Sequence, residues 1–223
     1  MSDDEIERWI EGAIEADPQP QISEYDDSVT DTPLSSEDLL TGRAELAVWQ
    51  APDAFRQRVD NLTRRSRSSE FFNDPQHKFL RDAWTLAEFT RHKAVDQVRL
   101  TAEREQWPDG QFHIGDETIN VEITIALAPG RRLGAEYRLA GKIELDPVES
   151  WIERAALIRG AVDKAIAKKV EKRYASRPWL LVYLNINEYG IRQAETEAAI
   201  AEVKQCYSGA FAAIYVLWKD KLL

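Results

Sequence analysis

The sequence is poor in the residues that build disulfides and zinc sites. It has one cysteine, Cys206, and three histidines, at positions 77, 92 and 113, among 223 residues. A single cysteine cannot form a disulfide within the chain, and it argues against a cysteine-ligated metal site. The histidines are too widely spaced to form a zinc-binding pair on one helix, and the chain has no Gly-x-Ser-x-Gly motif. These absences argue against zinc hydrolases and α/β-type serine hydrolases.

Long hydrophobic runs are also missing. No apolar segment approaches the roughly 20 residues needed to cross a bilayer. The acidic amino terminus lacks the basic and then apolar order of a secretory signal. With 43% hydrophobic residues, the chain has enough apolar side chains for one sizeable core. We therefore expect a cytoplasmic protein with one domain and a tail.

Negative charge is concentrated at one end of the chain. Residues 1–40 contain 13 acidic side chains and a single basic one, whereas residues 41–223 contain 26 acidic and 28 basic side chains. The larger part is thus nearly neutral and can present a basic face to phosphates despite the net charge of −10. We interpret residues 1–40 as an acidic, largely disordered arm. It can serve as a solvating tail, dock a protein partner, or cover a basic cleft as a phosphate mimic.

Apolar periodicity predicts the order of the remaining elements. Helices are expected at 76–92, 147–174 and 192–207, and strands near 95–103, in a hairpin at 110–126, and at 179–186 and 211–218. Strands joined through helices run parallel, whereas a hairpin is antiparallel. We therefore predict an α/β fold for residues 76–223, with a mixed central β-sheet and helices on both faces.

Residues 41–75 are predicted to form a helical, arginine-rich extension of this core. Its basic side chains are Arg43, Arg56, Arg58, Arg64, Arg65 and Arg67. Arginine clusters can hold a phosphate backbone. The alternative is a solvated helix face.

The predicted hairpin carries its acidic groups on one face. Apolar and polar residues alternate on both sides of residues 115–118, which we take as the loop. This register pairs Gln111 with Glu122 and makes Asp109 and Glu122 diagonal neighbours, roughly 7–8 Å apart. Two carboxylates at that distance can share one Mg²⁺ or Mn²⁺ ion. A solvated acidic face is the alternative.

Two charged residues interrupt the apolar stripes of the predicted helices. In helix 76–92, Leu80 and Trp84 are followed on the same stripe by Glu88. In helix 147–174, Lys169 occupies the stripe one turn after Ala165 and Ile166. Lys169 either extends along the stripe to solvent or reaches the site of Asp109 and Glu122 and supplies positive charge there.

This order of elements, with Pro108-Asp109 on one strand and Glu122-Ile123-Thr124 on the next, resembles the PD-(D/E)XK nuclease superfamily over residues 76–218. The resemblance implies a restriction-endonuclease-like core in which Asp109, Glu122 and Glu88 hold Mg²⁺ or Mn²⁺. The superfamily's catalytic lysine is replaced here by Thr124. Some branches carry this lysine on a neighbouring helix, which implies Lys169 as the replacement and Lys172 as the second choice.

The resemblance also gives a role to the loop after the hairpin. At the mouth of such a site, Arg131, Arg132 and Arg138 could hold a nucleic-acid backbone, and Tyr137 could stack on a base. The expected activity is that of a magnesium-dependent endodeoxyribonuclease that hydrolyses phosphodiester bonds of DNA. The alternative is an inactive nuclease-like module that binds nucleic acid or a protein partner.

Overall fold

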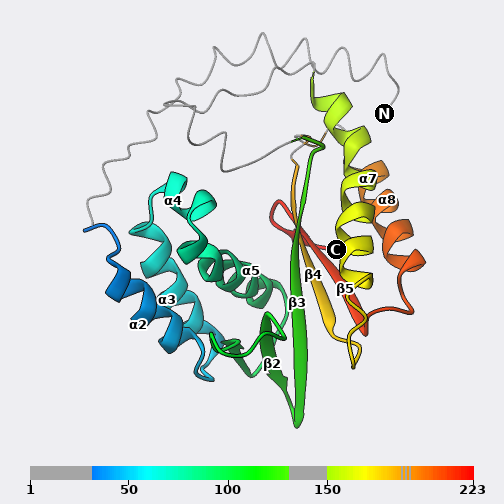
Figure 1. Ribbon diagram of the computed structural model, residues 1–223. Helices are drawn as coiled ribbons and strands as arrows, with labels where there is room; N and C mark the ends of the chain where they lie inside the picture. The colour runs from blue at the N-terminus through cyan, green and yellow to red at the C-terminus, as the bar shows by residue number, and fades with distance from the viewer. Residues whose placement is uncertain (1–31, 131–149, 187, 189, 191) are drawn as a thin grey trace.

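The computed structural model describes residues 32–130, 150–186, 188, 190 and 192–223 (Figure 1). This part of the chain is an α/β fold built on a mixed sheet of six strands in the order β1-β2-β3-β4-β5-β6. The strands are β1 (Gln97–Leu100), β2 (Gly110–Ile114), β3 (Glu117–Leu127), β4 (Trp179–Asn185), β5 (Ala213–Trp218) and β6 (Lys221–Leu222). Strands β3, β4 and β5 are parallel, and the other neighbours are antiparallel. The predicted mixed sheet is therefore confirmed.

Helices cover both faces of this sheet. The helices are α2 (Ser36–Leu46), α3 (Pro52–Arg64), α4 (Ser68–Asn73), α5 (Lys78–His92), α7 (Ser150–Val170) and α8 (Gln193–Cys206), with a 3₁₀ turn at Pro75–His77. Figure 1 shows α2 to α5 on one side and α7 and α8 on the other. Two buried clusters correspond to these sides. Alternation along β3 and β4 accounts for both, since successive side chains point to opposite faces.

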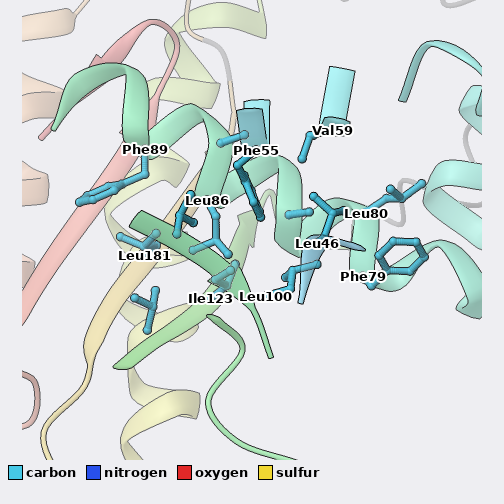
Figure 2. Packing of buried hydrophobic residues seen from close by; sticks show 14 of the residues in the cluster. Leu46, Phe55, Val59, Phe79, Leu80, Leu86, Phe89, Leu100, Ile123 and Leu181 are labelled. Atoms are coloured by element: carbon cyan, nitrogen blue, oxygen red, sulfur yellow. The ribbon is translucent and has the colours of Figure 1, made fainter. Parts of the chain in front are cut away.

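The first cluster joins α5 to the sheet. Phe89 of α5 stacks on Phe112 of β2 with ring centroids 5.0 Å apart. Leu86, Ile123 and Leu181 are buried beside them (Figure 2). Each buried side chain of this size stabilises the fold by roughly 1.5–3 kcal/mol. This cluster fixes α5 over one face of β3.

Helices α2 and α3 pack against α5 and extend the same cluster. Their buried contributions include Leu46, Phe55 and Val59 (Figure 2). Helix α2 begins at Ser36 because Ser35 and Asp38 form a capping box, in which each side chain bonds the other residue's backbone N–H. The prediction of a largely disordered arm up to residue 40 is therefore wrong for residues 36–40. Residues 1–31 lie outside the described part.

The arginines of α3 and its C-terminal flank make local ion pairs. Arg58 pairs with Glu45, Arg65 pairs with Asp38, and Arg56 donates to the Thr90 hydroxyl. Proline begins α3 at Pro52, which separates it from α2. These contacts hold the arginines within the fold, and phosphate contact by the arginine run stays a prediction.

The hairpin has a different register from the one predicted. Ile114 pairs with Glu117 and Gln111 pairs with Asn120, so the loop is only Gly115-Asp116. Gly115 has φ +57, a conformation that glycine adopts without strain. The predicted loop was two residues too long, and the pairing is shifted by two residues. Because side chains alternate with a period of two, the shift leaves every residue on its predicted face.

Candidate functional site

Three charged side chains from distant parts of the chain meet between β3 and α7. The ammonium Nζ of Lys169 lies 2.6 Å from Oε2 of Glu122 and 3.1 Å from Oδ2 of Asp109. Asp109 precedes β2, Glu122 belongs to β3, and Lys169 lies in the last turn of α7. The structure therefore brings together three of the predicted site residues.

The corrected register explains why the two carboxylates are so close. Gly110 pairs with Val121, so the next position outward places Asp109 beside Glu122 rather than diagonal to it. The backbone N–H of Ile123 donates to Oδ2 of Asp109 at 2.8 Å, so the carboxylate takes a place where a strand carbonyl would otherwise accept. This bond holds Asp109 against β3 and directs its charge toward Lys169.

Packing of α7 fixes the position of Lys169. Ile158, Val162 and Ile166 are fully buried on the side of α7 that meets the sheet, and Lys169 continues this stripe. Glu122 reaches the same layer because it alternates with Val121 and Ile123, which point to α5. The ammonium group is therefore enclosed with the carboxylates, and only 2% of the Glu122 side chain is exposed.

Tyr174 and Lys172 complete the surroundings of Glu122. The Tyr174 hydroxyl donates to Oε2 of Glu122 at 2.7 Å, and Lys172 Nζ lies 3.5 Å from the same oxygen with its side chain 53% exposed. Trp107 stacks on Tyr174 with ring centroids 6.2 Å apart. Among the described residues, the hydrogen bonds to Glu122 are all accepted by Oε2, and those to Asp109 are all accepted by Oδ2. No described residue donates a hydrogen bond to Oε1 of Glu122 or Oδ1 of Asp109. One oxygen of each carboxylate can therefore accept a further ligand.

The charges fix the protonation states of the groups around Glu122. Burial disfavours the ammonium form of Lys169, but the carboxylates of Asp109 and Glu122 outweigh this effect and raise the pKa of Lys169 above its usual value. Burial and the hydrogen bond to Glu122 raise the pKa of Tyr174. At neutral pH, Lys169 is a cation and Tyr174 is a neutral donor. Lys169 can thus stabilise negative charge, but it cannot act as a general base.

Asp82 of α5 is a further acidic neighbour that the sequence analysis missed. Burial is the main cause that raises the pKa of Asp82, Lys78 opposes the shift, and the charge of Asp109 adds to it. Asp82 bonds Lys78 at 2.8 Å, one helical turn away. A signal was present in the sequence, because Asp82 falls between the buried Phe79 and Leu86 at helical spacing.

Glu88 does not belong to this site, which corrects the prediction that it helps to hold the metal. Glu88 lines a pocket with Asn185 at the end of β4, whereas Glu122 pairs with Leu180 near the start of that strand. Its Oε1 accepts from Nε of Arg91 at 3.0 Å. Helical periodicity identified a charged residue on the packing side of α5, but it did not show over which part of the sheet that residue lies.

The structure describes Thr124 but not the predicted nucleic-acid-binding loop. Thr124 pairs with Val182 and shares the α7-facing side of β3 with Glu122, at a half-buried position. Arg131, Arg132, Tyr137 and Arg138 lie outside the described residues. In the described ranges, no group of three or more His, Cys, Asp or Glu side chains is arranged to hold a metal ion. Within the described part of the chain, a metal here would rest on Asp109 and Glu122.

Comparisons with known proteins assign no family to this arrangement. Neither family models nor curated proteins nor solved structures gave a significant match to the chain. None of the helices in the described part is both long enough and apolar enough to span a bilayer.

Proposed function

We propose that the protein is a metal-dependent nuclease that hydrolyses phosphodiester bonds of DNA, with a restriction-endonuclease-like core. The observation that carries the proposal is the contact of Lys169 with both Asp109 and Glu122. A strand carboxylate, a neighbouring carboxylate and a lysine are the three groups that the resemblance to PD-(D/E)XK nucleases implies. Here the lysine comes from a helix instead of from the position of Thr124.

The two carboxylates suit a hard divalent cation. Both contact the single Nζ of Lys169, so their oxygens converge on one point at distances within reach of a small cation. Mg²⁺ is commonly bound by one or two carboxylates, with waters and substrate phosphate as its other ligands. Asp109 and Glu122 would hold Mg²⁺ or Mn²⁺, which supplies Lewis-acid activation of water and phosphate when it is bound.

The chain's own residues would then divide the remaining work. Lys169 would donate from its ammonium group to the attacking water or to a phosphate oxygen, and so stabilise the negative charge that grows on the phosphorane. Tyr174 would keep the Glu122 carboxylate oriented by its hydrogen bond. Lys172, which is half exposed beside Glu122, would attract a second phosphate of the strand.

A cleavage assay with matched variants tests this proposal. Purified protein is incubated with supercoiled plasmid and Mg²⁺ or Mn²⁺, beside the Asp109→Ala, Glu122→Ala double variant and a Glu117→Ala control. Glu117 is an exposed carboxylate at the start of β3, far along the strand from the site. We expect cleavage by the wild type and by Glu117→Ala only. Equal cleavage by the double variant would refute the assignment.

A catalytically silent module that binds nucleic acid or a protein partner is the second candidate. It is favoured by Thr124 and by the finding that, within the described ranges, no third carboxylate joins Asp109 and Glu122 in a metal-holding group, where the resemblance implied Glu88 as a further ligand. Calorimetric titration with Mn²⁺ separates the two functions. A nuclease should show heat that disappears in the Asp109→Ala, Glu122→Ala variant, whereas a silent module should show none. The acidic segment 1–40 remains the predicted docking arm for a protein partner.

A further inference from the structure

A pocket lies at the end of the sheet away from the Asp109–Glu122 pair. It has a volume of about 300 Å³ and is lined in part by Trp84, Glu88, His92, Tyr183, Asn185 and Lys219. Glu122 pairs with Leu180 near the start of β4, whereas Asn185 ends that strand. At 3.3 Å per residue the two positions are roughly 16–17 Å apart along the strand. The pocket is therefore separate from the proposed catalytic site.

The pocket occupies a position where α/β sheets commonly bind ligands. It opens beyond the carboxyl ends of the parallel strands β4 and β5, where the backbone leaves the sheet. Helix α5 supplies one wall through Trp84, Glu88 and His92, which are spaced by four residues and share one face. This is the stripe whose charged residue the sequence analysis assigned to the metal site.

The walls favour a flat, uncharged ligand. Trp84 and Tyr183 meet edge to face with ring centroids 4.8 Å apart and provide aromatic surface. Both charged lining residues already have partners of opposite charge. Glu88 pairs with Arg91, and Lys219 pairs at 2.6 Å with the fully buried Glu188. A charged ligand would find no uncompensated charge among these groups.

The polar groups indicate which edge such a ligand would present. Only Oε1 of Glu88 is used by Arg91, and within the described residues Oε2 accepts no hydrogen bond. Two adjacent N–H donors on one planar edge pair with the two oxygens of a carboxylate, so Oε2 would accept one bond and Oε1 would accept the other on the lone pair that Arg91 leaves free. Guanine has that edge in its N1–H and exocyclic amine. The volume also accommodates a ring with its sugar.

We propose that this pocket binds a nucleobase, with guanine preferred, through Glu88 and the aromatic wall of Trp84 and Tyr183. The base can come from a free nucleoside or from an unpaired position of a nucleic-acid strand. The proposal does not depend on the nuclease activity, because the pocket shares no residue with the Asp109–Glu122 site.

Equilibrium binding without added metal tests the proposal. Isothermal titration of the full chain uses guanosine, 1-methylguanosine, adenosine, and guanine-containing or guanine-free single-stranded oligonucleotides. The variant Glu88→Ala removes the acceptor. Arg91→Ala is the matched control, because it breaks the same ion pair and leaves the carboxylate in place. Glu88→Leu, which also lacks an acceptor, replaces Glu88→Ala if the latter does not fold by circular dichroism.

We expect saturable guanosine binding that weakens roughly tenfold or more with 1-methylguanosine and with Glu88→Ala. Arg91→Ala should bind like the wild type. Binding of the guanine-containing oligonucleotide alone, if it depends on Glu88, would identify the strand as the source and would support the proposal. No binding of any guanine probe at millimolar concentration, or binding that Glu88→Ala leaves unchanged, would overturn it.

Discussion

Replacing Lys169 with methionine should destabilise the protein and yet strengthen its binding of divalent cations. Methionine keeps the apolar length of the side chain and removes the charge that contacts Glu122 at 2.6 Å and Asp109 at 3.1 Å. The two carboxylates then face each other without their shared counter-ion. At neutral pH this leaves buried negative charge uncompensated, because Glu122 is only 2% exposed.

The size of the stability loss follows from the burial of the ion pairs that Lys169 makes. Breaking a buried ion pair by removing one partner costs about 3–5 kcal/mol. Two carboxylates within about 5–6 Å of each other repel by about 3 kcal/mol at an effective dielectric constant of about 20. The Tyr174 hydrogen bond and the nearby Lys172 remain and offset part of this loss. We therefore expect a loss of about 2–4 kcal/mol in the free energy of unfolding.

Urea unfolding at pH 8, with and without Mn²⁺, measures both effects. Lys172→Met is the matched control, because Lys172 is half exposed and such ion pairs contribute at most about 1 kcal/mol. Mn²⁺ at about 100 times its dissociation constant stabilises a folded protein by about 2.7 kcal/mol. At equal Mn²⁺ concentration, the free energy of unfolding of Lys169→Met should rise by more than that of the wild type, since no ammonium group competes with Mn²⁺ for the carboxylates. A variant as stable as the wild type, or one that gains less from Mn²⁺, would refute the reasoning.

Four further predictions concern the same region. Tyr174→Phe should lower the free energy of unfolding by about 1–2 kcal/mol and weaken Mn²⁺ binding, because Glu122 loses a donor; Tyr207→Phe, which breaks an exposed bond to Asp163, is the control. Thr124→Lys in the Lys169→Met background should restore part of the plasmid cleavage, since residue 124 shares the face of Glu122; no recovery would contradict that placement. Gly110→Ala should lower the free energy of unfolding by about 1–3 kcal/mol, because the added Cβ would lie 2.5 Å from Leu86 Cδ1. Gly160→Ala in α7 adds a Cβ with no neighbouring atom within 4 Å, so it should stabilise the protein by up to about 1 kcal/mol in thermal unfolding. Because the pKa of Lys169 is raised above the ordinary value of 10.5, the stabilisation of the fold by its ammonium group should be complete below about pH 10.5 and disappear as pH rises through the raised pKa. A difference in unfolding free energy between wild type and Lys169→Met that closes near neutral pH would contradict this.

The sequence predicted the faces of the elements better than their register. Alternation along 110–126 placed Val121 and Ile123 opposite Glu122, and helical spacing placed Lys169 on the packed side of α7. Both patterns depend on local backbone geometry, which a sequence encodes directly. The register depended on the loop, and a two-residue loop beginning with Gly115 competed with the four-residue loop that we chose.

Two acidic residues of α5 show why the full membership of the site could not be predicted from the sequence. Asp82 and Glu88 both interrupt the apolar side of this helix, and periodicity gives no reason to choose between them. The choice depends on how α5 crosses the sheet, because its two ends lie over different parts of the strands. That crossing is set by the packing of Leu86 and Phe89 against β2 and β4, which no local pattern contains.

The position of Lys169 on α7, and not on a strand, has a structural consequence. A lysine at position 124 would be placed beside Glu122 by the geometry of β3 alone. Lys169 reaches Glu122 only when Val162 and Ile166 are docked against the sheet. Formation of the site therefore depends on tertiary packing between the sheet and α7, not on the hairpin alone. The ion pair also contributes to that docking, since the Glu122 charge is buried only when the helix is in place. Assembly of the charged site and attachment of α7 thus support each other.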